Sequence, residues 1–280
     1  MKKLVLTGAA GRLGTCLRGP LAKMCDTLVS TDIVEGIGDL GPNESFVQAD
    51  LADLDAMVAV LDGADMVVHF GAIGDEAPFD AILSSNIIGA YNIWEAAHRN
   101  GVRRVVYASS IHVVGMHSKT AGIGLDASHR PDSYYGLAKC FAEDLARMYW
   151  DKRGIEAVCM RIFSCAQVSN PRAVSTWLSY GDLIHLVERA IDTPVTGYSV
   201  IYGISDNDRA PVDNTKARHL GFRPRDNAEQ FAEKMFAAAG PLDPLDKGNL
   251  CLGGPFATIE LGESGLAQLN LHLEDGAKDQ

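Results

Sequence analysis

A glycine-rich turn near the N-terminus constrains the fold of this chain more than any other feature. The segment GAAGRLG, residues 8–14, follows a short apolar run, residues 4–8, and opens a helical pattern over residues 12–24. Glycines at this spacing permit a tight turn, a close approach of the backbone to a pyrophosphate and close packing of helix on strand. The helix N-terminus then faces the negative charge. The turn therefore predicts the first βαβ unit of a dinucleotide-binding sheet.

Short apolar runs alternate with longer helical patterns along the chain. We predict strands at residues 4–8, 28–32, 66–71, 102–110, 157–164 and 199–205, and helices at residues 12–24, 51–62, 81–99, 134–152, 182–190 and 227–239. Strands separated by helices of this length imply parallel βαβ units with right-handed crossovers. The expected fold class is α/β, a Rossmann doubly wound parallel sheet with helices on both faces and a small C-terminal substrate-binding part.

The pattern loosens after Ser164, and residues from about 240 onward show no clear element. We therefore expect an NAD-binding Rossmann core over residues 1–165. Residues 166–280 are expected to supply substrate-binding loops and C-terminal elements that pack on this core. A length of 280 residues suits one such α/β unit.

Composition limits the partners that the chain can have. A net charge of -11 argues against nucleic acids and anionic membranes, because both are bound mainly through Lys and Arg. The six cysteines form no CxxC pair, which favours buried free thiols in a reducing compartment over disulfides or metal ligands. No apolar stretch is long enough to span a bilayer, and the apolar start fits a first strand better than a signal peptide. We predict a cytoplasmic protein with no metal.

An acidic residue, Asp32, ends the second predicted strand and lies 18 residues after Gly14. A carboxylate at this place accepts hydrogen bonds from the ribose hydroxyls of the adenosine and repels a 2′-phosphate. The cofactor is therefore predicted to be NAD rather than NADP. The alternative is a tight turn with an aspartate that caps a following helix.

Two further segments are candidates for cofactor contacts. Asp50 and Leu51 follow a strand-like run and could contact an adenine amino group; Asp50 could equally be the N-cap of the helix at residues 51–62. Gly71 and Ala72 end the third strand with small residues, which would let the backbone lie against a cofactor.

A tyrosine and a lysine, Tyr135 and Lys139, stand four residues apart in a predicted helix and so share one face. A phenol has a pKa near 10, so it can act as a base near neutral pH only where a cation favours the phenolate. Lys139 is expected to supply that charge, and Ser110, at the end of a strand, to hydrogen-bond the reacting oxygen. The neighbouring Tyr134 has the wrong spacing to Lys139 and is rejected as the base. Two unrelated surface residues are the alternative explanation of the pair.

Taken together, these motifs resemble the extended short-chain dehydrogenase/reductase family. The matching segments are TGAAGRLG, HFGA, NIIGAYN, ASSIHVVG, PDSYYGLAK and MRIFS, in family order over about the first 165 residues. The resemblance implies a Tyr-Lys-Ser mechanism with NAD, and a supporting role for Asn86 beside the active-site helix. The residues then expected to bind the cofactor are Gly8, Gly11, Arg12, Leu13, Gly14, Asp32, Ile33, Asp50, Leu51, Gly71, Ala72, Asn86, Tyr135 and Lys139.

Within that family the chain is most similar to the uronate dehydrogenases. Segments such as RAVSTWLSYGDLIHLVERA, YGISDND, LGFRPRDNAE and a late glycine-rich segment with Gly253, Gly254 and Phe256 carry this closer match beyond residue 165. It implies NAD-dependent oxidation of C1 of glucuronate or galacturonate and release of an aldaric acid lactone. Arg172 then stands where an arginine binds the sugar carboxylate, a task that suits its planar fork of donors. The substrate-binding positions are Gly74, Ile111, His112, Ser164 and Arg172.

Three of the matched positions depart from the uronate dehydrogenase pattern, and they leave the substrate open. Ile111 replaces an expected Asn, Gly74 an expected Ser, and Arg12 an expected Gln. A site built from hydrogen bonds discriminates strongly when they are removed. A related acidic sugar such as sulfoquinovose is therefore a second candidate substrate.

Two rival functions also stay open at the level of sequence. One is an NDP-sugar epimerase or dehydratase on the same fold, and the second is a non-catalytic NAD-sensing protein. Helices near residues 81–99 and 134–152 commonly form dimer faces in this family, which implies a homo-oligomer.

Overall fold

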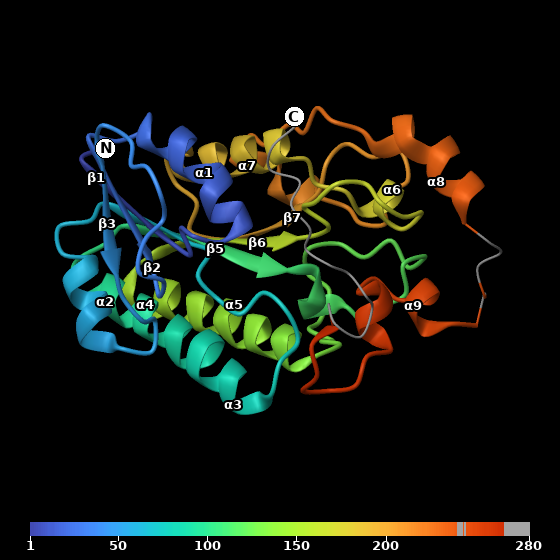
Figure 1. Cartoon of the computed structure of the whole chain (residues 1–280), viewed down its shortest axis with the longest axis horizontal. Coiled ribbons are helices and arrows are strands. Elements are labelled where there is room, and N and C mark those ends of the chain that lie inside the picture. The colour runs from blue at the N-terminus through green and yellow to red at the C-terminus, as the bar shows by residue number, and fades with distance from the viewer. Residues whose placement is uncertain (240–242, 244, 266–280) are drawn as a thin grey trace.

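The computed structural model describes residues 1–239, 243 and 245–265, and its centre is a parallel seven-stranded sheet (Figure 1). The strands lie in the order β3-β2-β1-β4-β5-β6-β7. Their bounds are β1 Lys3–Thr7, β2 Thr27–Asp32, β3 Glu44–Gln48, β4 Met66–His69, β5 Arg104–Ser110, β6 Glu156–Ile162 and β7 Tyr198–Gly203. The strand order reverses between β1 and β4, and in open α/β sheets ligands bind at the carboxyl ends of the strands beside such a point.

The apolar runs in the sequence become strands that are covered on both faces. β4, β5 and β6 are buried along their whole length, as expected for the inner strands of a parallel sheet. β3 forms one edge and is partly exposed. The fold class predicted from the sequence is confirmed.

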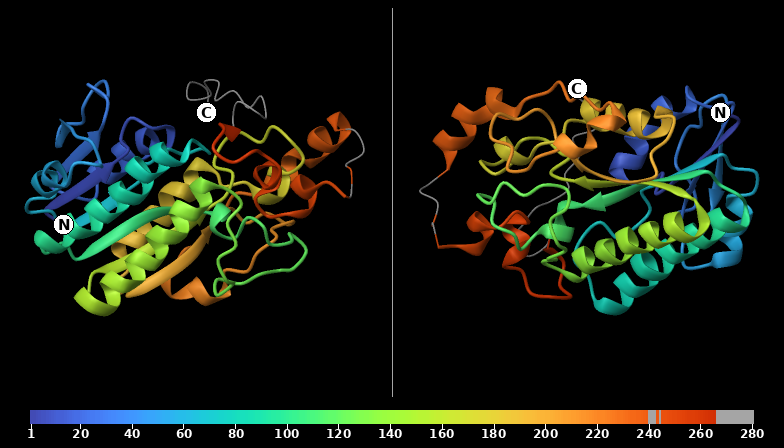
Figure 2. Two further views of the ribbon diagram at one scale, coloured as in Figure 1. Left: turned by 90° about the horizontal axis from the view of Figure 1, so that it is seen from below. Right: turned by 180° about the vertical axis from the view of Figure 1, so that it is seen from behind.

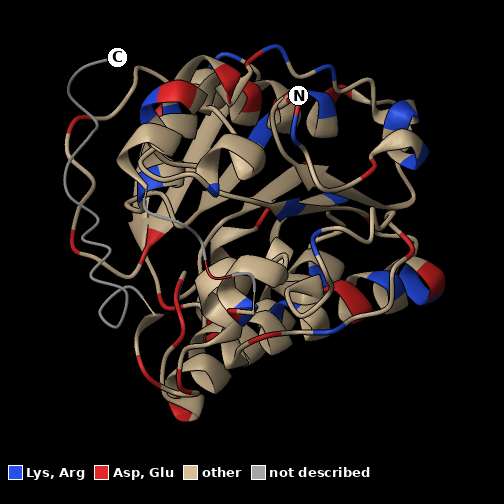
Figure 3. Ribbon diagram, turned by 90° about the vertical axis from the view of Figure 1, so that its right-hand side faces the viewer, with Lys and Arg blue, Asp and Glu red and all other residues tan. Residues whose placement is uncertain are grey.

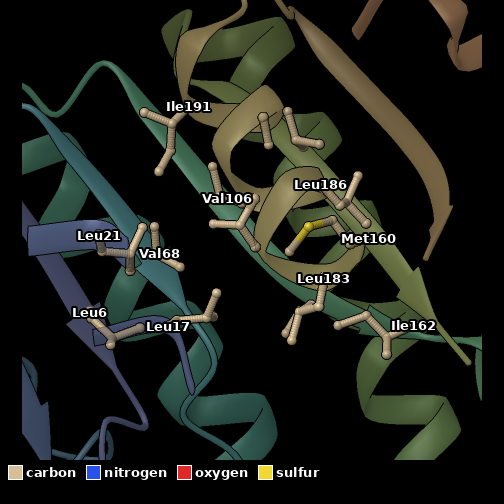
Figure 4. Packing of buried hydrophobic residues seen from close by; sticks show 14 of the residues in the cluster. Leu6, Leu17, Leu21, Val68, Val106, Met160, Ile162, Leu183, Leu186 and Ile191 are labelled. Carbon is tan, nitrogen blue, oxygen red and sulfur yellow. The ribbon is translucent and has the colours of Figure 1, made fainter. Parts of the chain in front are cut away.

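Helices pack on both faces of this sheet (Figure 2). One face is covered by α1 (Arg12–Ala22) and α7 (Tyr180–Asp192), and the other by α2 (Leu54–Val60), α4 (Gly89–Arg99) and α5 (Tyr134–Arg153). The first core, part of which Figure 4 shows, contains Leu17, Leu21, Val68, Val106, Met160, Leu183 and Leu186. The second core contains Met57, Trp94, Tyr107, Leu145 and Cys159.

A third, smaller apolar cluster lies beyond the carboxyl ends of β5 and β6. It joins residues that are far apart in the sequence: Ile111, Val113, Phe163, Tyr202 and Leu252. The short elements in this region are η2 (Ile111–Val114), α6 (Ala173–Thr176), η4 (Ala228–Phe231), α8 (Ala232–Ala238), α9 (Lys247–Leu250) and η5 (Gly254–Ala257). A further short element, η3 (Thr215–Leu220), packs beside β7 and contributes to the first core instead. The C-terminal part of the chain therefore contributes to the end of the sheet where a ligand is expected.

The structure corrects several predicted boundaries. The helix expected at residues 81–99 consists of α3 (Phe79–Ile82), a π-helical turn η1 (Leu83–Ile88) and α4. The helix expected from residue 51 begins at Leu54, because the Asp53 carboxylate accepts the Ala56 N–H at 3.0 Å and caps it. The region after residue 240, predicted to lack clear elements, contains α9 and η5 within its described part.

Several properties bear on partners and location. Acidic and basic residues are interspersed over the helices and loops of the side shown in Figure 3. Within residues 1–239, 243 and 245–265, no helix combines the length and apolar character needed to cross a membrane. The same part of the chain contains no group of His, Cys, Asp or Glu suited to a metal ion. All six cysteines are free thiols.

Candidate active site

The glycine turn after β1 is shaped by backbone contacts that exclude a side chain. Gly8 has φ +73°, and a Cβ there would lie 2.6 Å from the backbone nitrogen of Gly71. A Cβ on Gly14 would overlap the carbonyl oxygen of Gly8, so α1 packs directly on the turn. The turn therefore leaves an open cradle of backbone at the N-terminus of a helix, a shape that fits a pyrophosphate.

The Asp32 carboxylate is held against this turn at the end of β2. Its Oδ2 accepts the backbone N–H of Ala10 at 2.9 Å, and its Oδ1 accepts that of Ile33 at 2.8 Å. No helix begins at Asp32, because the next element of the described chain is β3. The alternative of a helix-capping aspartate is therefore wrong, and the carboxylate is fixed where ribose hydroxyls are expected.

The remaining predicted cofactor contacts surround the turn. Asp50 accepts the N–H of Ala52 at 2.9 Å and is not the cap of α2, so that alternative is also wrong. The backbone N–H of Gly71 donates to the Thr7 hydroxyl at 3.1 Å, which ties the end of β4 to β1. Asn86, in the π-helical turn, makes two hydrogen bonds to the backbone of Ile73, at 2.8 and 2.9 Å. These contacts fix the loop after β4 beside the glycine turn.

Three predicted catalytic residues meet where β5 ends and α5 begins. Tyr135 and Lys139 lie in the first turns of α5, and Ser110 is the last residue of β5. A Cβ on Gly136 would lie 2.6 Å from the carbonyl oxygen of His112, which shows how closely α5 packs on η2. The Lys139 Nζ donates to the Ala108 carbonyl at 2.7 Å and lies 5.4 Å from the ring centre of Tyr135. The three predicted catalytic residues therefore lie close together at the carboxyl end of β5.

Burial controls the protonation of this group. It raises the pKa of Tyr135 to about 12, although a hydrogen bond with the Ser110 hydroxyl acts in the opposite direction. Burial also lowers the pKa of Lys139 to about 7. In the protein alone the pKa of the phenol is thus raised, whereas the sequence led us to expect that Lys139 would favour the phenolate. Desolvation is the largest cause of both pKa shifts.

Tyr134 is turned away from this group. Its ring packs edge-on against Phe79 at 5.4 Å between ring centres. Only Tyr135 of the two tyrosines lines the cavity described next. This placement agrees with the choice of Tyr135 as the base.

A cavity of about 390 Å³ joins the glycine turn to the catalytic group. All five predicted substrate-binding residues line it, and so do Gly8, Gly11, Arg12, Leu13, Gly14, Ala72, Ser110, Tyr135 and Lys139. Asp32, Ile33, Asp50, Leu51, Gly71 and Asn86 do not line it and lie around the turn instead. The cavity is thus continuous from the place expected for the cofactor to the place expected for the substrate.

Arg172 is a partly buried cation that lines this cavity. Its Nη1 donates to the Ser164 hydroxyl at 3.0 Å, and its Nη2 to the Leu252 carbonyl at 2.8 Å. Burial lowers the pKa of the guanidinium to about 10. Both hydrogen-bond partners are uncharged, and the Asp132 carboxylate acts on Arg172 only through space, without an ion pair. The positive charge of Arg172 can therefore pair with an anionic ligand.

The sequence analysis missed several residues that shape the site. Asp132 accepts a hydrogen bond from His112, Phe256 stacks on the same ring, and the Glu76 carboxylate accepts the backbone N–H of Tyr135 at 2.9 Å. Asp132 lies in the PDSYYGLAK segment and Phe256 in the late glycine-rich segment, so both stood inside matched motifs. No motif in the sequence around Glu76 indicates that it belongs to the site.

The fold and this cavity define an oxidoreductase of the dinucleotide-binding Rossmann class. The chain belongs to the NAD dependent epimerase/dehydratase family, whose model matches residues 4–176. The family agrees with the resemblance and with the cofactor predicted from the sequence.

Relatives named uronate dehydrogenase match most of the chain. Those from Pseudomonas putida and Agrobacterium fabrum are 42% and 45% identical; each alignment covers 91% of this chain and 97% of the relative. The crystal structure of a mutant uronate dehydrogenase from Agrobacterium tumefaciens, complexed with NAD, is 44% identical and has a TM-score of 0.89. That match covers 93% of this chain and 98% of the crystallised one.

Proposed function

We propose that the protein oxidises the C1 hydroxyl of a hexuronic acid, glucuronate or galacturonate, to an aldaric acid lactone with NAD. One observation supports the proposal that the substrate is acidic. The buried guanidinium groups of Arg104 and Arg161 pair with Glu156 and Glu143, whereas Arg172 has no carboxylate partner among the described residues. Arg172 is only partly exposed, and burial of a cation is costly unless it is paired, so a carboxylate on the substrate would supply the missing partner.

The cofactor is bound by the cradle around the glycine turn. The backbone of residues 8–14 would hold the pyrophosphate and Asp32 the ribose hydroxyls of the adenosine, because a side chain on Gly8 or Gly14 would fill the cradle. Lys139 would hold the ribose on the far side of the pyrophosphate. When bound, oxidised NAD supplies the hydride acceptor and a positively charged ring.

The side chains of the cavity perform the proton transfer. Ser110 hydrogen-bonds the C1 oxygen of the substrate, and the Tyr135 phenolate accepts the hydroxyl proton. Because burial raises the pKa of Tyr135 to about 12, the phenolate requires positive charge nearby, which protonated Lys139 helps to supply. C1 loses one hydrogen as hydride and its oxygen loses one as a proton, which leaves the lactone carbonyl. Arg172 anchors the distant carboxylate and so aligns C1.

The test is NADH formation with a panel of sugars. Glucuronate and galacturonate should be oxidised, and the corresponding neutral aldoses should react far more slowly. Sulfoquinovose tests the second candidate substrate, which is not favoured, because the relatives that match most of the chain are named uronate dehydrogenase. Absence of NADH with every acidic sugar would overturn the proposal. An NDP-sugar epimerase is not favoured, since relatives that match about nine tenths of the chain are named uronate dehydrogenase.

The chain also presents an apolar surface on α4 and α5, which supports a homo-oligomer. Tyr91, Leu137, Phe141 and Met148 are exposed there. Light scattering of the wild type and of a Leu137→Glu, Phe141→Glu variant tests this, with a smaller particle expected for the variant. A cytoplasmic location is supported by the six free thiols.

A further inference from the structure

Asp132 is a buried carboxylate whose partner is a cavity residue. Its side chain has no exposed area, and its Oδ2 lies 2.8 Å from the Nδ1 of His112. Its Oδ1 accepts the Ser133 hydroxyl at 2.9 Å. Because an ionised carboxylate can only accept, the proton between Asp132 and the ring must be carried by Nδ1.

The slot that holds this carboxylate is built from two glycines. A Cβ on either Gly115 or Gly253 would overlap the Asp132 carboxylate. The two glycines are themselves joined, since the N–H of Gly253 donates to the carbonyl of Gly115 at 2.9 Å. The carboxylate is thus confined from two sides, and one of the two walls comes from the C-terminal segment of the chain.

The imidazole ring of His112 is confined as well. Its centre lies 4.2 Å from that of Phe256, with the planes tilted by 32°, and 5.7 Å from that of Tyr135, which it meets edge-on. His112 lines the substrate cavity. With Nδ1 turned toward buried Asp132, the second ring nitrogen, Nε2, forms no hydrogen bond with a described residue and is left as the lone-pair acceptor of this cavity residue.

We propose that Asp132 is a positioning residue that fixes His112 in the Nδ1–H tautomer, so that Nε2 accepts a hydrogen bond from a substrate hydroxyl next to the reacting carbon. The His112 and Tyr135 rings lie 5.7 Å apart between centres and both line the cavity, so a sugar held at Tyr135 comes within reach of His112. The inference rests on the proposed oxidation of a sugar acid and adds a requirement for a donor at the adjacent position. A site that holds a hydroxyl through a buried polar group rejects the analogue that lacks it.

The kinetic test compares a uronic acid with its 2-deoxy analogue in three proteins: wild type, Asp132→Asn and the control Asp126→Asn. Asp126 is an exposed carboxylate paired with Lys216, away from the cavity. The wild type and the control should prefer the hydroxylated sugar by about 100-fold or more in kcat/KM. An amide can either donate or accept, so Asp132→Asn no longer fixes the tautomer, and the preference should fall about 10-fold or more. Direct titration should give the same NAD Kd in all three. An unchanged preference in Asp132→Asn would overturn the proposal.

A second measurement uses the wild-type protein without substrate, so it does not depend on whether a variant folds. The ¹⁵N NMR shifts of the His112 ring in the wild type report directly which nitrogen is protonated. A protonated Nδ1 and an unprotonated Nε2 are expected in the uncharged ring, whether or not any sugar acid is oxidised. The reverse tautomer would overturn the positioning role on its own. Failure of the sugar panel with the expected tautomer would instead count against the proposed reaction.

Discussion

Replacement of Arg172 by Gln tests the link between structure and substrate most directly. The guanidinium has five N–H donors. Two of them are used within the protein, in hydrogen bonds to the Ser164 hydroxyl and the Leu252 carbonyl. The remaining donors can form charge-assisted hydrogen bonds with a carboxylate, each contributing about 1.5–3 kcal/mol. Two such bonds predict a loss of at least about 3 kcal/mol, or about 100-fold in kcat/KM, at about 1.4 kcal/mol per tenfold.

The assay must separate this loss from damage to the fold. Arg172→Gln also removes the donor to the Leu252 carbonyl, and a buried unsatisfied group costs about 1–3 kcal/mol of stability. That cost is the same for every substrate, so the informative quantity is the kcat/KM ratio of glucuronate to glucose. We expect the ratio to fall about 100-fold, mainly through KM, with NAD affinity unchanged. Arg147→Gln, at an exposed guanidinium on α5, is the matched control. An equal loss with both sugars would refute the assigned role of Arg172.

Three further predictions concern the base, the cofactor and the buried ion pair. Tyr135→Phe should lower kcat by at least about 100-fold, within the range for loss of a general base, while NAD binding measured by titration persists; retained turnover would exclude the phenol as base. Arg12→Gln should weaken NAD binding about 5- to 10-fold and reduce its salt dependence, since Arg12 lines the cavity beside the glycine turn; an unchanged Kd at low salt would place Arg12 outside the cofactor site. Burial alone would raise the pKa of Glu143, but hydrogen bonds from His129, Arg161 and Ser109 hold it below its ordinary value. The stability that this lowered pKa contributes is therefore present above about pH 4.5 and is lost as the pH falls through the folded-state pKa. Urea unfolding should show Glu143→Gln destabilised by about 3–5 kcal/mol at pH 7 and less sensitive to acid than the wild type; parallel pH curves would contradict this.

The features that could be predicted from the sequence depend on local constraints. A positive φ at Gly8 and the contact of Gly14 with the turn allow no side chain, so the glycine spacing reflects the geometry directly. Tyr135 and Lys139 share a face because a helix repeats every 3.6 residues. Apolar runs become buried strands because the inner strands of a parallel sheet are covered on both faces. By contrast, the π-helical turn η1 has no periodicity of its own in the sequence, and the helix cap considered at Asp50 lies three residues before the observed cap, Asp53.

The substrate half of the site depends on contacts between distant parts of the chain, and this explains why sequence patterns describe it poorly. Arg172 is fixed by a carbonyl 80 residues away, and Glu76, which holds the N-terminus of α5, accepts the N–H of Gly262, 186 residues away. Phe256 packs on His112 from the same C-terminal segment. Among the described residues, these partners form no hydrogen bond with the glycine turn at residues 8–14. Changes within residues 251–262 can therefore move the substrate-binding side chains while the cofactor cradle stays the same. For this reason, departures such as Ile111 and Gly74 bear on which sugar acid is bound and leave the hydride chemistry to the turn, Tyr135 and Lys139.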